Sequence, residues 1–139
     1  ASGTGTTQAG LICGQLMNND DKKIIGISIA RKNPKGRDIV CQSVREYLNY
    51  AGTPVGEATI QSKTIFVDEY TNSGYGTESK LVNETIIRLW TKYGIPTDHT
   101  YTAKAYAGMT DYLKNNNVTG ENVLFIHTGG TPLFFDDIT

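Results

Sequence analysis

ASGTGTTQAG, residues 1–10, contains three glycines and four hydroxyl side chains and runs directly into an apolar, helix-like segment at 11–17. Glycines let backbone N–H groups turn inward and let a bulky anion approach closely. The hydroxyl side chains add donors, and the N-terminus of the following helix adds a favourable dipole. The simplest ligand for such a loop is a phosphate group. The residues alone leave a second interpretation open, in which the stretch is a disordered, Gly/Thr-rich terminus.

The place of this loop in the chain is unusual. A phosphate-binding loop normally follows a strand, whose C-terminal end directs it at the ligand. Here the sequence begins inside the loop. We therefore expect it to be a piece of a longer protein.

Length and composition narrow the function classes. The 139 residues suffice for one domain with a hydrophobic core. A formal net charge of −1, with acidic and basic residues mixed, argues against a dedicated nucleic-acid-binding protein. No run of about 18 apolar residues is present that could span a membrane. Cys13 and Cys41 fall in apolar helical patterns, which favours two buried free thiols over a disulfide or a metal site. We expect a soluble, cytoplasmic α/β domain.

Three apolar, β-branched runs predict strands, at 23–30, 63–68 and 122–127. The first is nearly continuous in its apolar character, as in a parallel strand that is covered on both faces. Each run is followed by a loop rich in glycine or in polar residues.

Helical periodicity fills the segments between these runs. It predicts helices at 37–50 and 103–116, and a further helix that Thr77 or Ser79 caps and that ends at Gly94. The predicted buried stripe of that further helix is Leu81, Val82, Thr85, Ile86, Leu89 and Trp90. The alternation predicts a three-layer α/β/α fold with a mostly parallel sheet.

Open α/β sheets bind ligands at the edge formed by the carboxyl ends of their strands. The loop at 3–7, the Gly74-Tyr75-Gly76 loop and the glycine-rich turn after His127 all belong at such strand ends. One ligand could therefore contact all three.

Four stretches of the sequence carry a resemblance to a known family. They are residues 2–10 (SGTGTTQAG), 74–76 (GYG), 101–105 (YTAKA) and 124–130 (LFIHTGG). Together, in this order and approximate spacing, they resemble the fold-type II pyridoxal-phosphate enzymes, specifically the D-cysteine desulfhydrase and 1-aminocyclopropane-1-carboxylate deaminase family. The resemblance implies a sheet like that of the tryptophan synthase β subunit, with this chain as the C-terminal portion of the large domain.

The resemblance also implies roles for individual residues. The loop would hold the phosphate of pyridoxal 5′-phosphate through Gly3, Thr4, Gly5, Thr6 and Thr7, in agreement with the loop chemistry. Tyr75 and Tyr101 look like the two active-site tyrosines, whose phenols can transfer a proton or hold a carboxylate. Without the resemblance, either tyrosine would be interpreted as an ordinary half-buried ring.

Thr102 and Thr128 are the candidate partners of the cofactor's pyridine nitrogen. The deaminase members carry a carboxylate directly after the second tyrosine, where this chain has Thr102. A neutral hydroxyl partner leaves the ring a weaker electron sink, which suits the loss of a good leaving group such as a thiol. The resemblance therefore favours the desulfhydrase branch. His127, at the end of a predicted strand, is interpreted as structural.

One part of the family pattern is absent from this sequence. The Schiff-base lysine and the loop for the substrate carboxylate precede the phosphate loop in the family, and Lys104 does not match that lysine. We therefore expect the chain to be inactive alone and to need the N-terminal segment of its own protein. The resemblance implies a small amino acid as substrate and a homodimer as the assembly.

Two alternatives stay open. The full protein could be a 1-aminocyclopropane-1-carboxylate deaminase, because the segment present here does not separate the two activities. The chain could also be a non-catalytic phosphate- or nucleotide-binding module that uses the same α/β scaffold.

Overall fold

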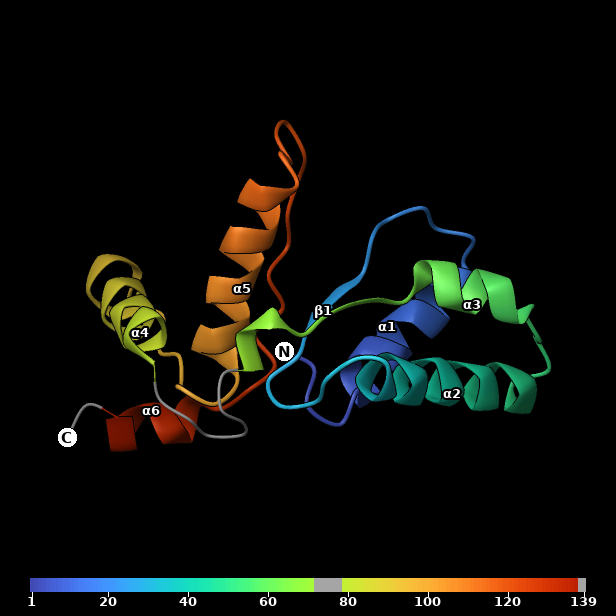
Figure 1. The fold of residues 1–139 in the computed structure, drawn as a ribbon, viewed down its shortest axis with the longest axis horizontal. Coiled ribbons are helices and arrows are strands. Elements are labelled where there is room, and N and C mark those ends of the chain that lie inside the picture. The colour runs from blue at the N-terminus through green and yellow to red at the C-terminus, as the bar shows by residue number, and fades with distance from the viewer. Residues whose placement is uncertain (72–78, 138–139) are drawn as a thin grey trace.

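The computed structural model describes residues 1–71 and 79–137, and Figure 1 shows their arrangement. The elements, in chain order, are α1 (Thr6–Met17), β1 (Ile25–Ile27), α2 (Lys35–Tyr50), α3 (Glu57–Lys63), β2 (Ile65–Val67), a 3-10 turn (Glu69–Thr71), α4 (Lys80–Tyr93), α5 (Thr102–Asn115) and α6 (Thr131–Asp137). Among these residues, no helix combines the length and the apolar character needed to cross a bilayer.

The two strands form a small parallel sheet. Ile25 pairs with Ile65 and Ile27 pairs with Val67. The predicted α/β class with parallel strands is therefore confirmed. Each strand is shorter than its apolar run, because a strand extends only as far as a neighbouring backbone accepts and donates its hydrogen bonds.

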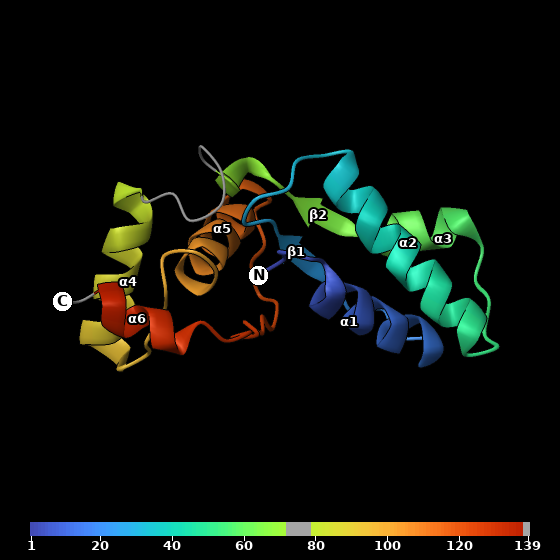
Figure 2. The same ribbon diagram turned by 90° about the horizontal axis from the view of Figure 1, so that it is seen from below.

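Alternate side chains of the sheet enter two different cores. Phe66 joins the core between α1, α2 and α3, whereas Ile27 and Val67 pack with Ala105 of α5 on the opposite face. Figure 2 shows α1, α2 and α3 on one side of the strands and α5 on the other. This alternation follows from the period of two along a strand, and it gives the three layers that the sequence predicted.

The core between the three N-terminal helices is the larger one. Its buried residues are Ala9, Ile12, Cys13, Val40, Cys41, Val44, Leu48, Ile60 and Phe66. Both cysteines are buried free thiols, as the sequence predicted. The sequence did not predict α3, which contributes Ile60 to this core.

Helix α4 begins and ends where the sequence predicted. The Ser79 hydroxyl accepts a hydrogen bond from the Val82 N–H at 3.2 Å, and Gly94 ends the helix at φ +66°. Thr77, the other candidate cap, lies outside the described residues. The predicted buried stripe is only partly correct, because Leu81 and Trp90 are 47% and 45% exposed.

Helix α6, which the sequence did not predict, covers part of that stripe. Its Phe134 is buried with Val82 and Ile86 of α4, and the Trp90 ring lies 4.9 Å from the Phe134 ring. Trp90 is therefore packed on one face and open to solvent on the other.

The third predicted strand, 122–127, is wrong. The segment has no strand assignment, and Leu124 is 83% exposed. Only Phe125 packs inward, on the α5 side of the sheet and against the Tyr106 ring at 5.3 Å. An apolar run becomes a strand only beside another strand, and none in the described part of the chain pairs with this segment.

Candidate functional site

The glycine-threonine loop is anchored beside the first strand. The Ser2 N–H donates to the Ile27 carbonyl at 2.8 Å, and the Ile29 N–H donates to the Ser2 carbonyl at 3.2 Å. The bridge is parallel, so the chain after Ser2 leaves at the carboxyl end of β1. The loop thus begins at the edge where open α/β sheets place their ligands.

The side chain of Gln8 locks the first turn of α1 to the sheet. Its Nε2 donates to the Ile65 carbonyl at 2.8 Å, and its Oε1 accepts from the Ser2 hydroxyl at 3.0 Å. Gln8 lies directly over Gly26, where a Cβ would overlap the amide group. The loop and the helix that it opens are therefore fixed to both strands.

Gly5 makes the turn from the loop into α1. Its φ is +94°, and a Cβ at this position would lie 2.8 Å from Cγ2 of Val40. Gly5 has no side chain that could cap α1, and the Thr6 N–H donates to the Thr4 hydroxyl at 3.5 Å. The hydroxyls of Thr4 and Thr6 lie 3.1 Å apart, and Thr4, Thr6 and Thr7 are exposed. Backbone N–H groups at a helix N-terminus, flanked by hydroxyls, form a suitable cradle for a phosphate.

Tyr101 lies beside this loop. A Cβ on Gly3 would come 3.8 Å from Cε1 of Tyr101, so the ring lies close to the loop. Tyr101 immediately precedes α5, which packs against the face of the sheet opposite α1. The loop and one of the two predicted active-site tyrosines are therefore neighbours.

A buried carboxylate fixes the start of α5. Asp98 is 0% exposed, and its Oδ2 accepts from the N–H groups of Thr100 and Tyr101 at 3.0 and 2.7 Å. Its Oδ1 accepts from the Thr102 N–H at 2.9 Å and from the Thr102 hydroxyl at 2.7 Å. The carboxylate thus sets the backbone from which the Tyr101 ring projects.

The C-terminal glycine turn lies against the same carboxylate. A Cβ on Gly130 would overlap Oδ1 of Asp98 and lie 2.7 Å from its Cγ, and Gly130 has φ +86°. His127 Nε2 is hydrogen-bonded to the Pro96 carbonyl at 2.8 Å. These contacts hold the turn beside the start of α5, and Thr128, which lies between them in the chain, is exposed.

Three of the four family stretches therefore meet. The loop at 3–7 lies beside Tyr101, and the segment around Tyr101 lies against Gly130 through Asp98. Tyr75 and its flanking glycines lie outside the described residues.

Thr102 is near this site, but its hydroxyl is directed at Asp98. It donates to Oδ1 and accepts from the Asp98 N–H at 3.0 Å. Since its one proton is used there, it is not placed to donate to a ring nitrogen in this arrangement. Thr128 keeps that role as a prediction.

Lys104 is the least expected feature of the site. It is 1% exposed, and its Nζ lies 3.5 Å from the Ile29 carbonyl at the end of the β1 segment. Burial lowers the pKa of this amine, and the negative charge of Asp98 partly opposes the shift. Asp98 and Lys104 therefore place opposite charges beneath the loop and Tyr101.

The sequence identified neither Asp98 nor Lys104 as a site residue. Asp98 carried a signal, because an aspartate just before a helical pattern is a typical N-terminal cap. Lys104 carried none, since a lysine is usually expected on the exposed face of a helix.

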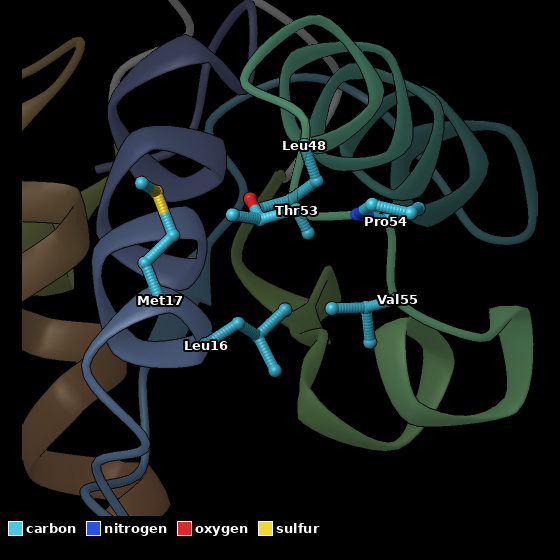
Figure 3. A pocket seen from close by; sticks show the side chains of 6 residues that line it. All are labelled: Leu16, Met17, Leu48, Thr53, Pro54 and Val55. Atoms are coloured by element: carbon cyan, nitrogen blue, oxygen red, sulfur yellow. The ribbon is translucent and has the colours of Figure 1, made fainter.

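The cavity in Figure 3 is a different place. It is lined by Leu16, Met17, Leu48, Thr53, Pro54 and Val55 and encloses about 220 Å³. It lies at the C-terminal end of α1, about 15 Å along the helix from the loop at the N-terminal end. Its mostly apolar lining offers no catalytic group. The described residues also contain no cluster of His, Cys, Asp or Glu that could hold a metal ion.

The sequence comparisons find named relatives along nearly the whole chain. A D-cysteine desulfhydrase from Yersinia enterocolitica is 34% identical over 136 residues, which are 97% of this chain and 40% of that protein. A Pyrococcus abyssi protein, named provisionally as a 1-aminocyclopropane-1-carboxylate deaminase, is 34% identical over 135 residues, 39% of its length. No protein-family model matches this chain.

The structural comparison agrees with them. The solved structure of an ACC deaminase homologue matches 97% of this chain with a TM-score of 0.82 and 30% identity. The chain spans about 40% of the length of these relatives. The resemblance stated from the four stretches is confirmed.

Proposed function

Because this chain is homologous to D-cysteine desulfhydrases and 1-aminocyclopropane-1-carboxylate deaminases over nearly its whole length, we propose that its full protein is a pyridoxal-phosphate-dependent lyase. Its proposed reaction is the α,β-elimination of a small amino acid, with D-cysteine as the first candidate substrate, to a 2-oxo acid, ammonia and sulfide. The observation that carries this proposal is the position of the Tyr101 ring beside Gly3 of the loop to which we assign the cofactor's phosphate.

The loop fits the phosphate of the cofactor. Gly5 leaves no side chain at the turn or at the N-cap position of α1. Thr4, Thr6 and Thr7 add exposed hydroxyls that can donate to phosphate oxygens. We assign the cofactor-phosphate contacts to Gly3, Thr4, Gly5, Thr6 and Thr7.

The groups around the loop would act on the reacting part of the ligand. The bound cofactor would supply the electron sink that makes proton removal from an amino acid feasible. Tyr101 lies next to the loop, where its phenol can hold or transfer a proton beside the substrate carbon that loses its proton. Thr128, on the exposed turn before Gly130, is the proposed hydroxyl partner of the ring nitrogen, and Tyr75 is the second proposed phenol.

The choice of D-cysteine over the cyclopropane substrate rests on position 102. Thr102 stands where the deaminase members carry a carboxylate, and its hydroxyl is bonded to Asp98. Without a carboxylate at this position the ring nitrogen stays weakly basic, which favours a substrate with a good leaving group.

The rest of the protein belongs to the same proposal. This chain would be the C-terminal portion of the large domain, and the Schiff-base lysine would come from the N-terminal segment. The chain alone would therefore be inactive, and the complete protein would be a homodimer.

The test is turnover by the full-length protein supplied with pyridoxal phosphate. D-Cysteine should yield pyruvate and sulfide, and the Tyr101→Phe variant, which keeps the ring and loses the phenol, should be about 10²- to 10⁴-fold slower. Preference for 1-aminocyclopropane-1-carboxylate would favour the deaminase alternative. Phosphate binding without turnover of either substrate would favour a non-catalytic module.

A further inference from the structure

Arg31 makes two hydrogen bonds to the backbone of the phosphate loop. Its Nη1 donates to the Gly3 carbonyl at 2.7 Å and to the Thr4 carbonyl at 2.6 Å. The two partners lie 28 and 27 residues away in the sequence, so this contact exists only in the folded chain. None of the ion pairs found among the described residues involves Arg31.

The position of Arg31 is itself fixed. Its carbonyl accepts from the Ser28 hydroxyl at 2.7 Å, which ties residue 31 to the end of the β1 segment. A Cβ on Gly36 would lie 3.1 Å from Cβ of Arg31 and would also overlap the Phe66 ring, so the α2 N-terminus packs closely there. The guanidinium therefore reaches the loop from a rigid base.

The two carbonyl contacts determine where the loop's N–H groups point. In a trans peptide the carbonyl and the following N–H point in opposite directions. The Gly3 carbonyl shares its peptide with the Thr4 N–H, and the Thr4 carbonyl shares its peptide with the Gly5 N–H. With both carbonyls turned to Arg31, these two N–H groups face away from it.

We propose that Arg31 is the positioning residue of the phosphate loop, which aims the Thr4 and Gly5 N–H groups at the cofactor's phosphate. This inference rests on the proposed function of the loop. Arg31 acts through the backbone and does not touch the ligand. The guanidinium also adds a fixed positive charge behind the loop, which favours a bound dianion.

The neighbouring cation serves as a matched control. Lys32 Nζ donates at 2.8 Å to the carbonyl of Asp68, the residue that follows β2. Lys32→Met removes the same formal charge as Arg31→Met but leaves the Gly3 and Thr4 contacts in place. Arg31→Lys keeps the charge, but its ammonium ends about one bond short of the position of Nη1, the single nitrogen that donates to both carbonyls.

The experiment measures the affinity of the full-length protein for pyridoxal phosphate, inorganic phosphate and pyridoxal, which lacks the phosphate. Arg31→Met should lower the affinity for pyridoxal phosphate and for inorganic phosphate by about 10- to 100-fold, a loss of about 1.4 to 2.8 kcal/mol in binding free energy. Its affinity for pyridoxal should stay within about threefold of the wild-type value. Lys32→Met should change each affinity by less than about threefold, and Arg31→Lys should restore little of the loss.

Three results would overturn the inference. Unchanged phosphate affinity in Arg31→Met would refute it directly. An equal loss of affinity for pyridoxal, which lacks the phosphate, would mean that Arg31→Met disturbs the structure in general. Wild-type affinity in Arg31→Lys would mean that charge alone, and not the orientation of the loop, is what matters.

The proposed function can fail separately. If the wild-type protein binds pyridoxal phosphate with the Arg31 dependence stated but turns over neither D-cysteine nor the cyclopropane substrate, the enzymatic proposal is wrong and the role of Arg31 stands.

Discussion

Replacing Asp98 with asparagine should lower the free energy of unfolding by about 2–6 kcal/mol. Each oxygen of the buried carboxylate accepts two hydrogen bonds, from Thr100 and Tyr101 on one side and from the N–H and hydroxyl of Thr102 on the other. Asparagine has one oxygen, so either orientation of its amide turns an NH₂ group toward two donors. Two donors then lose their acceptor, at about 1–3 kcal/mol each.

The assay is urea unfolding of the 139-residue chain, followed by far-ultraviolet circular dichroism. With a slope of about 2 kcal/mol per molar urea, the midpoint should fall by about 1–3 M. Asp38→Asn is the control, since Asp38 is an exposed residue in the first turn of α2 and its loss should cost less than about 1 kcal/mol. Equal midpoints for the two variants would refute the view that the Asp98 carboxylate holds the start of α5.

Two further predictions concern the same half of the chain. In urea unfolding, Gly130→Ala should lower the free energy of unfolding by at least about 2 kcal/mol more than Gly52→Ala. Both substitutions place alanine at a positive φ, but only the Cβ at 130 overlaps the Asp98 carboxylate. Equal losses would contradict the close approach of Gly130 to Asp98. Burial, with the charge of Asp111 adding to it, raises the pKa of Tyr70 to about 12 in the folded chain. Above the ordinary phenol pKa near 10 the unfolded chain loses this proton first, so the stability contributed by the protonated phenol is complete below about pH 10 and is lost as the pH rises toward 12. Stability measured from pH 9 to 12 should therefore fall less steeply in Tyr70→Phe than in the wild type, and parallel slopes would show that this phenol is not responsible.

Much of the helical structure was determined by short stretches of sequence. The Ser79 cap and the Gly94 stop act within one turn of the helix that they bound, and both lie where the sequence placed them. The same holds for α2 and α5, whose apolar periodicity is a local property.

The glycine-threonine loop was also recognisable from the sequence. Its composition predicts an anion-binding turn, and Gly5 adopts a positive φ, which favours glycine.

The tertiary structure decided which apolar runs became strands, because a strand depends on a partner segment far along the chain. The apolar run at 122–127 is not a strand, because a strand requires a second backbone beside it. For the same reason β1 and β2 are much shorter than their apolar runs.

The supporting residues of the site also emerged only from the fold. Arg31 reaches loop carbonyls that are 27 and 28 residues away, and Lys104 lies against the Ile29 carbonyl 75 residues away. A charged side chain is by default a solvated one, and only a specific buried acceptor changes that. The sequence alone therefore determined α2, α4, α5 and the loop, because their signals are local, whereas only the folded chain brought Arg31 to the loop carbonyls.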